Sequence, residues 1–230
     1  MIGFYDYTVI LTFLSLVSSV FGMTQAMSGH FALAVGCLAV SGLCDAFDGK
    51  VARTKKDRTE DESMFGIQLD SLCDVICFGV FPALLCYKLG VHGYIGGLAI
   101  SYYCICSVVR LSYFNVLEVK RQNSEDPGEK VFHGLPITSS SVIVPVFFLL
   151  RFAMPERAFA ALLTVLLFVV GTCFVLDFRM KKPSTPVLVL LIVIGAAAVV
   201  LFVFFSGRQM LTEGKHTLFT HLSETLHARA

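Results

Sequence analysis

The chain has 230 residues, of which 56% are hydrophobic, and its mean hydropathy is +0.76. A chain this apolar is not a soluble globular domain, and it is long enough for several membrane spans of about 20 apolar residues each. The net charge of +1 favours neither a nucleic-acid partner nor an acidic one. The eight cysteines lie in apolar segments without a CxxC pair and accompanying histidines, so we expect neither a zinc site nor a disulfide framework.

Seven apolar segments follow one another along the chain, and we interpret each as a membrane span. Two polar loops, residues 50–62 and 117–135, separate the second segment from the third and the fourth from the fifth. Pro82 predicts a kink in the third segment, and Pro136 suits the first turn of the fifth. In chain order, the spans are predicted at about residues 8–26, 31–53, 66–89, 93–116, 137–152, 157–176 and 186–205.

We therefore expect an all-α integral membrane protein. Its transmembrane core of six helices would comprise residues 1–182, followed by an additional transmembrane helix in residues 183–206 and a polar tail in residues 207–230. The first apolar run has no basic region before it, so we interpret it as a retained span and not as a signal peptide. Eleven Lys and Arg residues fall on the side of the loops that follow spans two, four and six, against six on the other side. This bias places those loops and the N-terminus in the cytoplasm.

Four aspartates lie where the second and third predicted spans meet the cytoplasmic loop. Asp45 and Asp48 are three residues apart, and Asp70 and Asp74 are four apart, so each pair shares one face of its helix. An acidic side chain at membrane depth costs roughly 2.5 to 3.5 kcal/mol to insert, so four together are hard to explain without cations. Carboxylate oxygens suit hard divalent cations, and two such ions about 4 Å apart can hold both oxygens of a phosphoryl displacement. The alternative is that these carboxylates are merely solvated at the helix ends.

Small residues share the faces of the carboxylates. Gly49 and Ala52 follow the first pair by about a turn, and Gly66 precedes Asp70 by one turn. They leave room beside the carboxylates for a flat or bulky ligand. The whole stretch reads D-x2-D-G-x2-A-R, a spacer of twelve residues after Arg53, and then G-x3-D-x3-D.

This pattern resembles the motif of the CDP-alcohol phosphotransferase family at every fixed position. The spacer is longer than is usual in the family, and we interpret its polar residues as an extended cytoplasmic loop. The resemblance implies that Asp45, Asp48 and Asp70 hold two Mg²⁺ or Mn²⁺ ions, and that Asp74 is the catalytic base and also a metal ligand. The implied residues for binding the cytidine diphosphate are Asp45, Asp48, Gly49, Ala52, Arg53, Gly66 and Asp70.

A second group of polar residues follows in the fourth span and the loop after it. Arg110 interrupts an apolar run, where an unpaired charge is unfavourable, so we expect a phosphate, a ligand carboxylate or a motif aspartate beside it. The simpler interpretations are a snorkelling or helix-pairing arginine and, for His133, an ordinary loop histidine. Arg-Leu-x-x-Phe-Asn-Val, which ends with Asn115 and Val116, and Phe-x-Gly-Leu-Pro resemble the phosphatidylserine synthase branch of the family. The resemblance implies that Arg110, Asn115 and His133 meet the acceptor or the lipid phosphate.

The branch resemblance implies CDP-diacylglycerol and L-serine as substrates, a homodimer, and a bacterial or archaeal cytoplasmic membrane. One alternative keeps the chemistry but changes the acceptor to glycerol 3-phosphate or an inositol phosphate. Another is a divalent-cation channel or transporter, since carboxylates within membrane segments also mark ion pathways. The grouping of the aspartates at one side of the membrane argues against the transporter.

Overall fold

The computed structural model describes residues 3–4, 6–52, 55, 59–122, 132–177 and 179–180. Short 3₁₀ segments flank two of the helices, and a π-helical segment, η2 (Val75–Val80), joins α3 to α4. Two two-residue strands, β1 (Phe132–His133) and β2 (Arg179–Met180), pair antiparallel. The helices of the described residues are α1 (Ile10–Met27), α2 (Phe31–Ala52), α3 (Glu60–Asp74), α4 (Phe81–Lys88), α5 (Gly93–Gln122), α6 (Ser140–Phe148) and α7 (Glu156–Val175).

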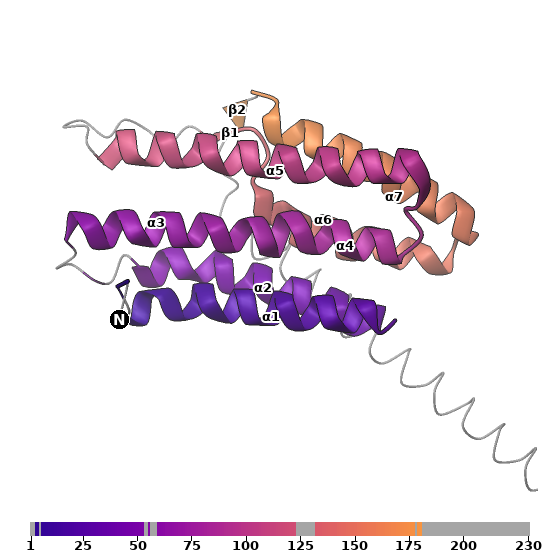
Figure 1. Cartoon of the computed structure of the whole chain (residues 1–230), viewed down its shortest axis with the longest axis horizontal. Helices are drawn as coiled ribbons and strands as arrows, with labels where there is room; N and C mark the ends of the chain where they lie inside the picture. The colour runs from indigo at the N-terminus through magenta and orange to yellow at the C-terminus, as the bar shows by residue number, and fades with distance from the viewer. Residues whose placement is uncertain are drawn as a thin grey trace, which may run out of the picture.

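The helices form a bundle whose long axes run in roughly the same direction (Figure 1). Besides the five long apolar stretches given below, the described residues contain a shorter one, Ile137–Phe152. The prediction of an all-α integral membrane protein is confirmed, while residues 183–206 and 207–230 lie outside the described part of the chain. Within the described residues, five stretches are long and apolar enough to cross a membrane, namely Tyr7–Met27, Phe31–Gly49, Glu60–Lys88, Gly93–Lys120 and Glu156–Val175.

The third helix begins six residues before the predicted start at Gly66. Its first turn is stabilised by a capping box, in which the Thr59 hydroxyl accepts from the Glu62 amide at 3.2 Å and the Glu62 carboxylate accepts from the Thr59 amide at 3.1 Å. Three acidic residues in the first turn suit the positive end of the helix dipole. The prediction that residues up to 62 form a loop was therefore wrong, because polarity was interpreted as irregular structure.

The N-terminal segment contacts the start of this helix. Lys55 forms ion pairs with Asp6 at 2.9 Å and with Glu62 at 3.3 Å. Hydrogen bonds from Thr8 and from the Lys55 ammonium hold the pKa of Asp6 below its usual range. The N-terminus, the loop after α2 and the start of α3 are thus connected at one end of the bundle.

Pro82 changes the helix that carries it in a specific way. Proline has no N–H to donate to the carbonyl four residues earlier, which here belongs to Phe78. The Tyr103 hydroxyl at 2.6 Å and the Ser140 hydroxyl at 3.2 Å donate to that carbonyl instead. The irregularity predicted at Pro82 takes the form of the π-helical segment η2 just before it. Pro136 lies just outside the following helix, with an extended backbone, and not in its first turn as predicted.

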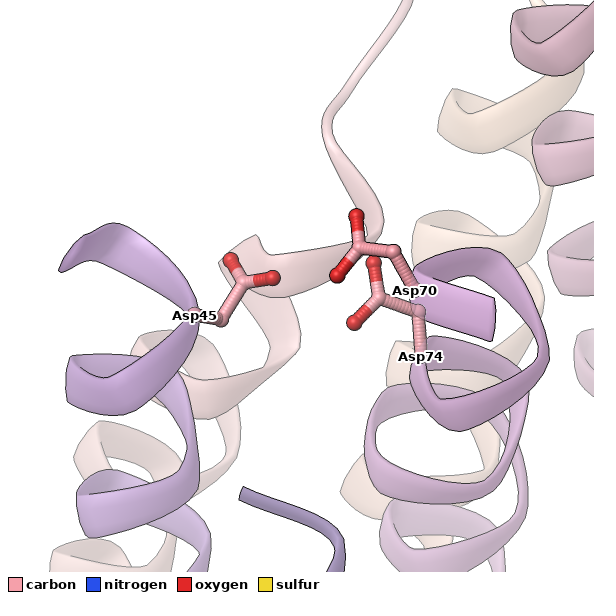
Figure 2. A group of neighbouring side chains, drawn as sticks. All are labelled: Asp45, Asp70 and Asp74. Carbon is pink, nitrogen blue, oxygen red and sulfur yellow. The ribbon is translucent and has the colours of Figure 1, made fainter. Parts of the chain in front are cut away.

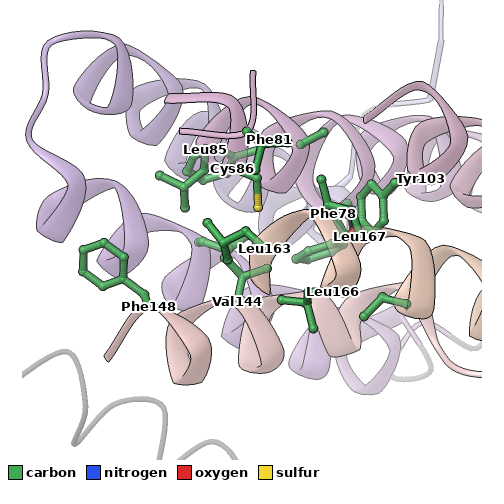
Figure 3. Close-up of a cluster of buried hydrophobic side chains, with 14 of the residues drawn as sticks. Phe78, Phe81, Leu85, Cys86, Tyr103, Val144, Phe148, Leu163, Leu166 and Leu167 are labelled. Carbon is green, nitrogen blue, oxygen red and sulfur yellow. Dashed lines mark hydrogen bonds between the residues drawn. The ribbon is translucent and has the colours of Figure 1, made fainter. Parts of the chain in front are cut away.

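Large buried side chains fill the space between α4, α5, α6 and α7 (Figure 3). Around α1 and α2, the packing is closer and more polar. The hydroxyls of Ser15 and Ser41 lie 2.6 Å apart, and Ser19 donates to Ser41 at 2.9 Å. Such small polar residues let membrane helices approach closely and hydrogen-bond across their interface. At Gly42, an added Cβ would overlap the Ser141 side chain, so α2 also lies directly against α6.

The start of α1, the end of α2, the start of α3 and the end of α5 lie towards one end of the bundle (Figure 1). Near the middle, the chain before α6 is attached to the end of α7, because the Leu135 amide donates to the Cys173 carbonyl at 3.1 Å. Gly134 has a φ of +71°, and a Cβ there would lie 2.9 Å from the Leu176 carbonyl oxygen. Only glycine combines that conformation with so close a contact.

Candidate functional site

Three aspartates from two neighbouring helices point towards one another (Figure 2). Asp45 comes from α2, and Asp70 and Asp74 come from α3. One carboxylate oxygen from each lies within 4.8 Å of the others. Asp74 is the most enclosed, with 8% of its surface exposed. The sequence prediction that these residues form one site is supported by their geometry.

The fourth aspartate joins the group through a cross-helix pairing. Asp45 and Asp74 interact across the two helices, and so do Asp48 and Asp70. The order is crossed because α2 and α3 run in opposite directions, so the later aspartate of one helix meets the earlier aspartate of the other. Each cross-helix contact brings together two groups that are acidic.

Like charges at this separation repel strongly when water is excluded, and only protons or cations between them relieve the repulsion. The donor set consists of carboxylate oxygens that converge from two helices, which fits a hard divalent cation such as Mg²⁺ or Mn²⁺. A site of soft-metal type would require thiolate or imidazole ligands, and neither belongs to this group of three. The arrangement is therefore an oxygen-only candidate metal centre.

The small residues have distinct surroundings. Among the described residues, nothing lies within 4 Å of a Cβ built at Gly49, so space is open near this end of α2. Gly66 lies half-buried on α3, one turn before Asp70, and Ala52 is the last residue of α2. Arg53 lies outside the described residues, so its predicted role in binding phosphate stays a prediction.

Arg110 is 6% exposed, which does not fit the interpretation that it snorkels to the membrane surface. Its Nε donates to the Leu135 carbonyl at 3.2 Å, and its guanidinium lies 5.7 Å from the centre of the Phe114 ring. In the part of the chain that the structure describes, no carboxylate forms an ion pair with it. Of the partners predicted for Arg110, the anion of a ligand is therefore the one to test.

Asn115 lies beside the helix turn that carries the aspartates, because its side-chain oxygen accepts from the Ser71 hydroxyl at 2.6 Å. Ser71 follows Asp70 directly and is 8% exposed. The sequence analysis missed Ser71, since nothing in the spacing of either helix indicates a contact across 44 residues. His133 lies in β1, opposite Arg179 in β2, and only its backbone is described.

Comparison with known proteins decides the family. The family model of the CDP-alcohol phosphatidyltransferases matches residues 7–174, which is well over half of the chain and includes all four aspartates. The chain belongs to this family. The resemblance predicted from the motif is thereby confirmed, and the matched range covers all six helical stretches of the core.

Curated relatives support the branch of the family that was predicted. A protein of Helicobacter pylori (strain ATCC 700392 / 26695) named CDP-diacylglycerol–serine O-phosphatidyltransferase is 34% identical over 148 residues, 64% of this chain and 58% of that one. An archaetidylserine synthase of Methanothermobacter thermautotrophicus is 36% identical over 144 residues, 62% of this chain and 58% of that one. In Saccharomyces cerevisiae, a CDP-diacylglycerol–serine O-phosphatidyltransferase is 30% identical over 145 residues, 60% and 51% of the two chains. The matched part spans little more than half the length of each relative.

The carboxylate group predicts two effects on thermal stability. Bound metal should stabilise the wild type, and removal of one carboxylate should abolish this gain. Mg²⁺ or Mn²⁺ at 100 times its dissociation constant should stabilise the wild type by about 2.7 kcal/mol, seen as a higher midpoint of thermal unfolding. Asp74→Asn should lose this shift, yet unfold at the same or a higher temperature than the wild type in chelator, because one repelling charge is gone. Asp61→Asn, an exposed acidic position on the same helix, is the matched control and should keep the shift. A normal metal shift in Asp74→Asn would exclude that carboxylate from the metal centre.

Proposed function

We propose that this protein transfers the phosphatidyl group of CDP-diacylglycerol to the hydroxyl of L-serine, producing phosphatidylserine and CMP. The observation that carries the proposal is the convergence of Asp45, Asp70 and Asp74 from α2 and α3, with Asp48 beside them on α2, in a member of the CDP-alcohol phosphatidyltransferase family. The names of the curated relatives, and the segment containing Arg110 and Asn115, support serine as the acceptor.

The donor would lie with its acyl chains in the bilayer and its cytidine diphosphate over the facing carboxylates of α2 and α3. The open space at Gly49 supports this placement, because the nucleotide can approach the helix backbone there. Ala52 and Gly66 are the other small residues proposed to line the nucleotide, and Arg53 is proposed to pair with a phosphate or a motif carboxylate. Each of these residues belongs to α2, α3 or the loop between them.

The protein groups have separate roles in the proposed reaction. Asp45, Asp48 and Asp70 would hold two Mg²⁺ or Mn²⁺ ions, together with Asp74. Bound ions would neutralise the diphosphate and the charge that develops on the leaving group. Asp74 would accept the proton of the serine hydroxyl as its oxygen forms a bond to the lipid phosphorus. The bond from that phosphorus to the bridging diphosphate oxygen breaks, and CMP leaves with that oxygen.

Positioning contributes at least as much as basicity to this proton transfer. A carboxylate near metal ions is a weak base, so the serine hydroxyl must be held within hydrogen-bonding distance of Asp74. Asp74 is well placed for this because it is the most enclosed carboxylate of the group of three. Arg110, Asn115 and His133 are proposed to meet the serine carboxylate or the lipid phosphate.

The proposal also includes the membrane, the orientation of the protein in it and its oligomeric state. The excess of Lys and Arg in the loops after spans two, four and six supports a cytoplasmic N-terminus and a cytoplasmic active site. A bacterial or archaeal cytoplasmic membrane and a homodimer are proposed from the family resemblance alone.

Product analysis tests the proposed function directly. Purified protein with CDP-diacylglycerol and Mg²⁺ or Mn²⁺ is offered L-serine, glycerol 3-phosphate or an inositol phosphate in separate reactions. We expect phosphatidylserine and equimolar CMP with serine alone, and no transfer in the presence of a chelator. Transfer of the phosphatidyl group to one of the other acceptors would retain the reaction type and replace serine as the substrate. Release of CMP with no acceptor-dependent lipid would reject the transferase.

Gly49→Leu tests where the nucleotide lies. Because nothing lies within 4 Å of a Cβ at this position, leucine fits the protein without ligand and should leave the unfolding temperature unchanged. The same side chain would occupy the proposed nucleotide space, so the apparent affinity for CDP-diacylglycerol should fall at least about tenfold, or about 1.4 kcal/mol. Gly97→Leu on α5 is the control, since its Cβ also meets nothing within 4 Å. Unchanged donor affinity in Gly49→Leu would place the cytidine elsewhere.

Arg110 tests which anion the α5 region binds. Loss of one partner of a buried charge pair costs about 3 to 5 kcal/mol, so Arg110→Ala should reduce transfer severely. Arg110→Lys should rescue poorly because the planar fork of donors is lost. Saturation curves are measured separately in serine and in CDP-diacylglycerol. A defect confined to the serine curve supports the acceptor carboxylate, whereas one confined to the donor curve assigns Arg110 to the lipid phosphate.

A further inference from the structure

The hydrogen bond between Ser71 and Asn115 connects the helix of the carboxylates to α5. The Ser71 hydroxyl and the Asn115 side-chain oxygen are 2.6 Å apart, and both residues lie at least partly buried. Ser71 directly follows Asp70 and precedes Asp74 by three residues. Asn115 therefore lies beside the turn of α3 that carries both aspartates.

In the structure, the side-chain oxygen of Asn115 faces α3. A carboxamide oxygen only accepts, so the Ser71 hydroxyl is the donor of this hydrogen bond. The NH₂ group of Asn115, with two N–H donors, is consequently turned away from Ser71. Among the residues that the structure describes, no protein acceptor is hydrogen-bonded to this NH₂ group. A half-buried amide in this position is available to donate to a ligand.

An acceptor whose hydroxyl lies at Asp74 must bind its other polar groups elsewhere in the site. Towards Asp45 and Asp48 the surroundings are acidic, and an anionic group of the acceptor would be repelled there. Towards α5 lies the Asn115 amide, whose NH₂ group is a donor. The carboxylate of an amino-acid acceptor, which is a pure hydrogen-bond acceptor when ionised, matches this side.

We propose that Ser71 is a positioning residue, which orients Asn115 so that its NH₂ group donates to the carboxylate of the amino-acid acceptor beside Asp74. This inference rests on the proposed function and deepens it, since it identifies which part of the acceptor is recognised from α5. Ser71 touches neither substrate in this arrangement. It acts through Asn115 and reduces the orientations that the amide would otherwise sample.

The test is a double-mutant cycle measured by saturation curves in serine and in CDP-diacylglycerol. Ser71→Ala should raise the KM for serine about fivefold, the effect expected when a hydrogen bond between neutral groups is lost, and leave the KM for CDP-diacylglycerol unchanged. Ser71→Thr, which keeps the hydroxyl, should restore most of the serine affinity. Asn115→Ala should raise the KM for serine at least as much. The double variant should equal Asn115→Ala, because Ser71 has no effect without its partner.

Ser107→Ala is the matched control. Ser107 is also a buried serine, but its hydroxyl donates to the Tyr103 carbonyl within α5, at 2.8 Å. Its loss should leave both KM values unchanged. Three results would overturn the inference in an active enzyme: a wild-type serine KM in Ser71→Ala, equal increases of both KM values, or additive effects in the double variant. Wild-type protein that makes no serine-dependent lipid would instead reject the proposed function itself, and the inference with it.

Discussion

The repulsion between carboxylates held close together is the constraint on which the rest of this structure depends. Carboxylate oxygens of Asp45, Asp70 and Asp74 lie within 4.8 Å of one another, and their charges, with that of Asp48, would push α2 and α3 apart if nothing opposed them. The opposing interactions come from the surrounding bundle. The serine contacts between α1 and α2, and the close approach of α2 to α6 at Gly42, hold one helix of the pair in place. The repelling carboxylates are thus held together by closely packed helices and by hydrogen bonds between them.

The other helix of the pair is connected to the bundle just after its last aspartate. The Phe78 carbonyl, to which Pro82 cannot donate, accepts hydroxyl hydrogen bonds from Tyr103 on α5 and Ser140 on α6. Two helices distant in sequence are thereby attached to the segment just after Asp74. Ser71 makes a further connection to α5 on the other side of that aspartate. The carboxylate turn is therefore fixed on both sides by hydrogen bonds to neighbouring helices.

The sequence was sufficient for those features that depend on spacing along one helix. It placed each aspartate pair on a single face, predicted the helices of the core, and identified a motif that the family match confirms. It did not predict the crossed pairing of the aspartates, the carbonyl partner of Arg110 or the contact of Ser71, because these depend on how helices lie against one another. The start of α3 was placed too late for another reason. A capping box at Thr59 lets acidic residues begin a helix, and in sequence those residues resemble a loop.

The π-helical segment η2 has a consequence for the phase of the helix around it. A π turn accommodates about one residue more than an α turn, and each residue in a helix advances the direction of the side chain by about 100°. The extra residue is therefore absorbed within the turn, so the carboxylate face before η2 and the buried apolar face after it keep their relative orientation. Deleting one residue between Val75 and Val80 would return this turn to α geometry with little rotation of Asp70 and Asp74 relative to α4. A change of length between Ala52 and Glu60 lies before α3 begins, and it alters the reach of a connection without rotating either face. This explains how a spacer longer than is usual in the family is compatible with an intact carboxylate group.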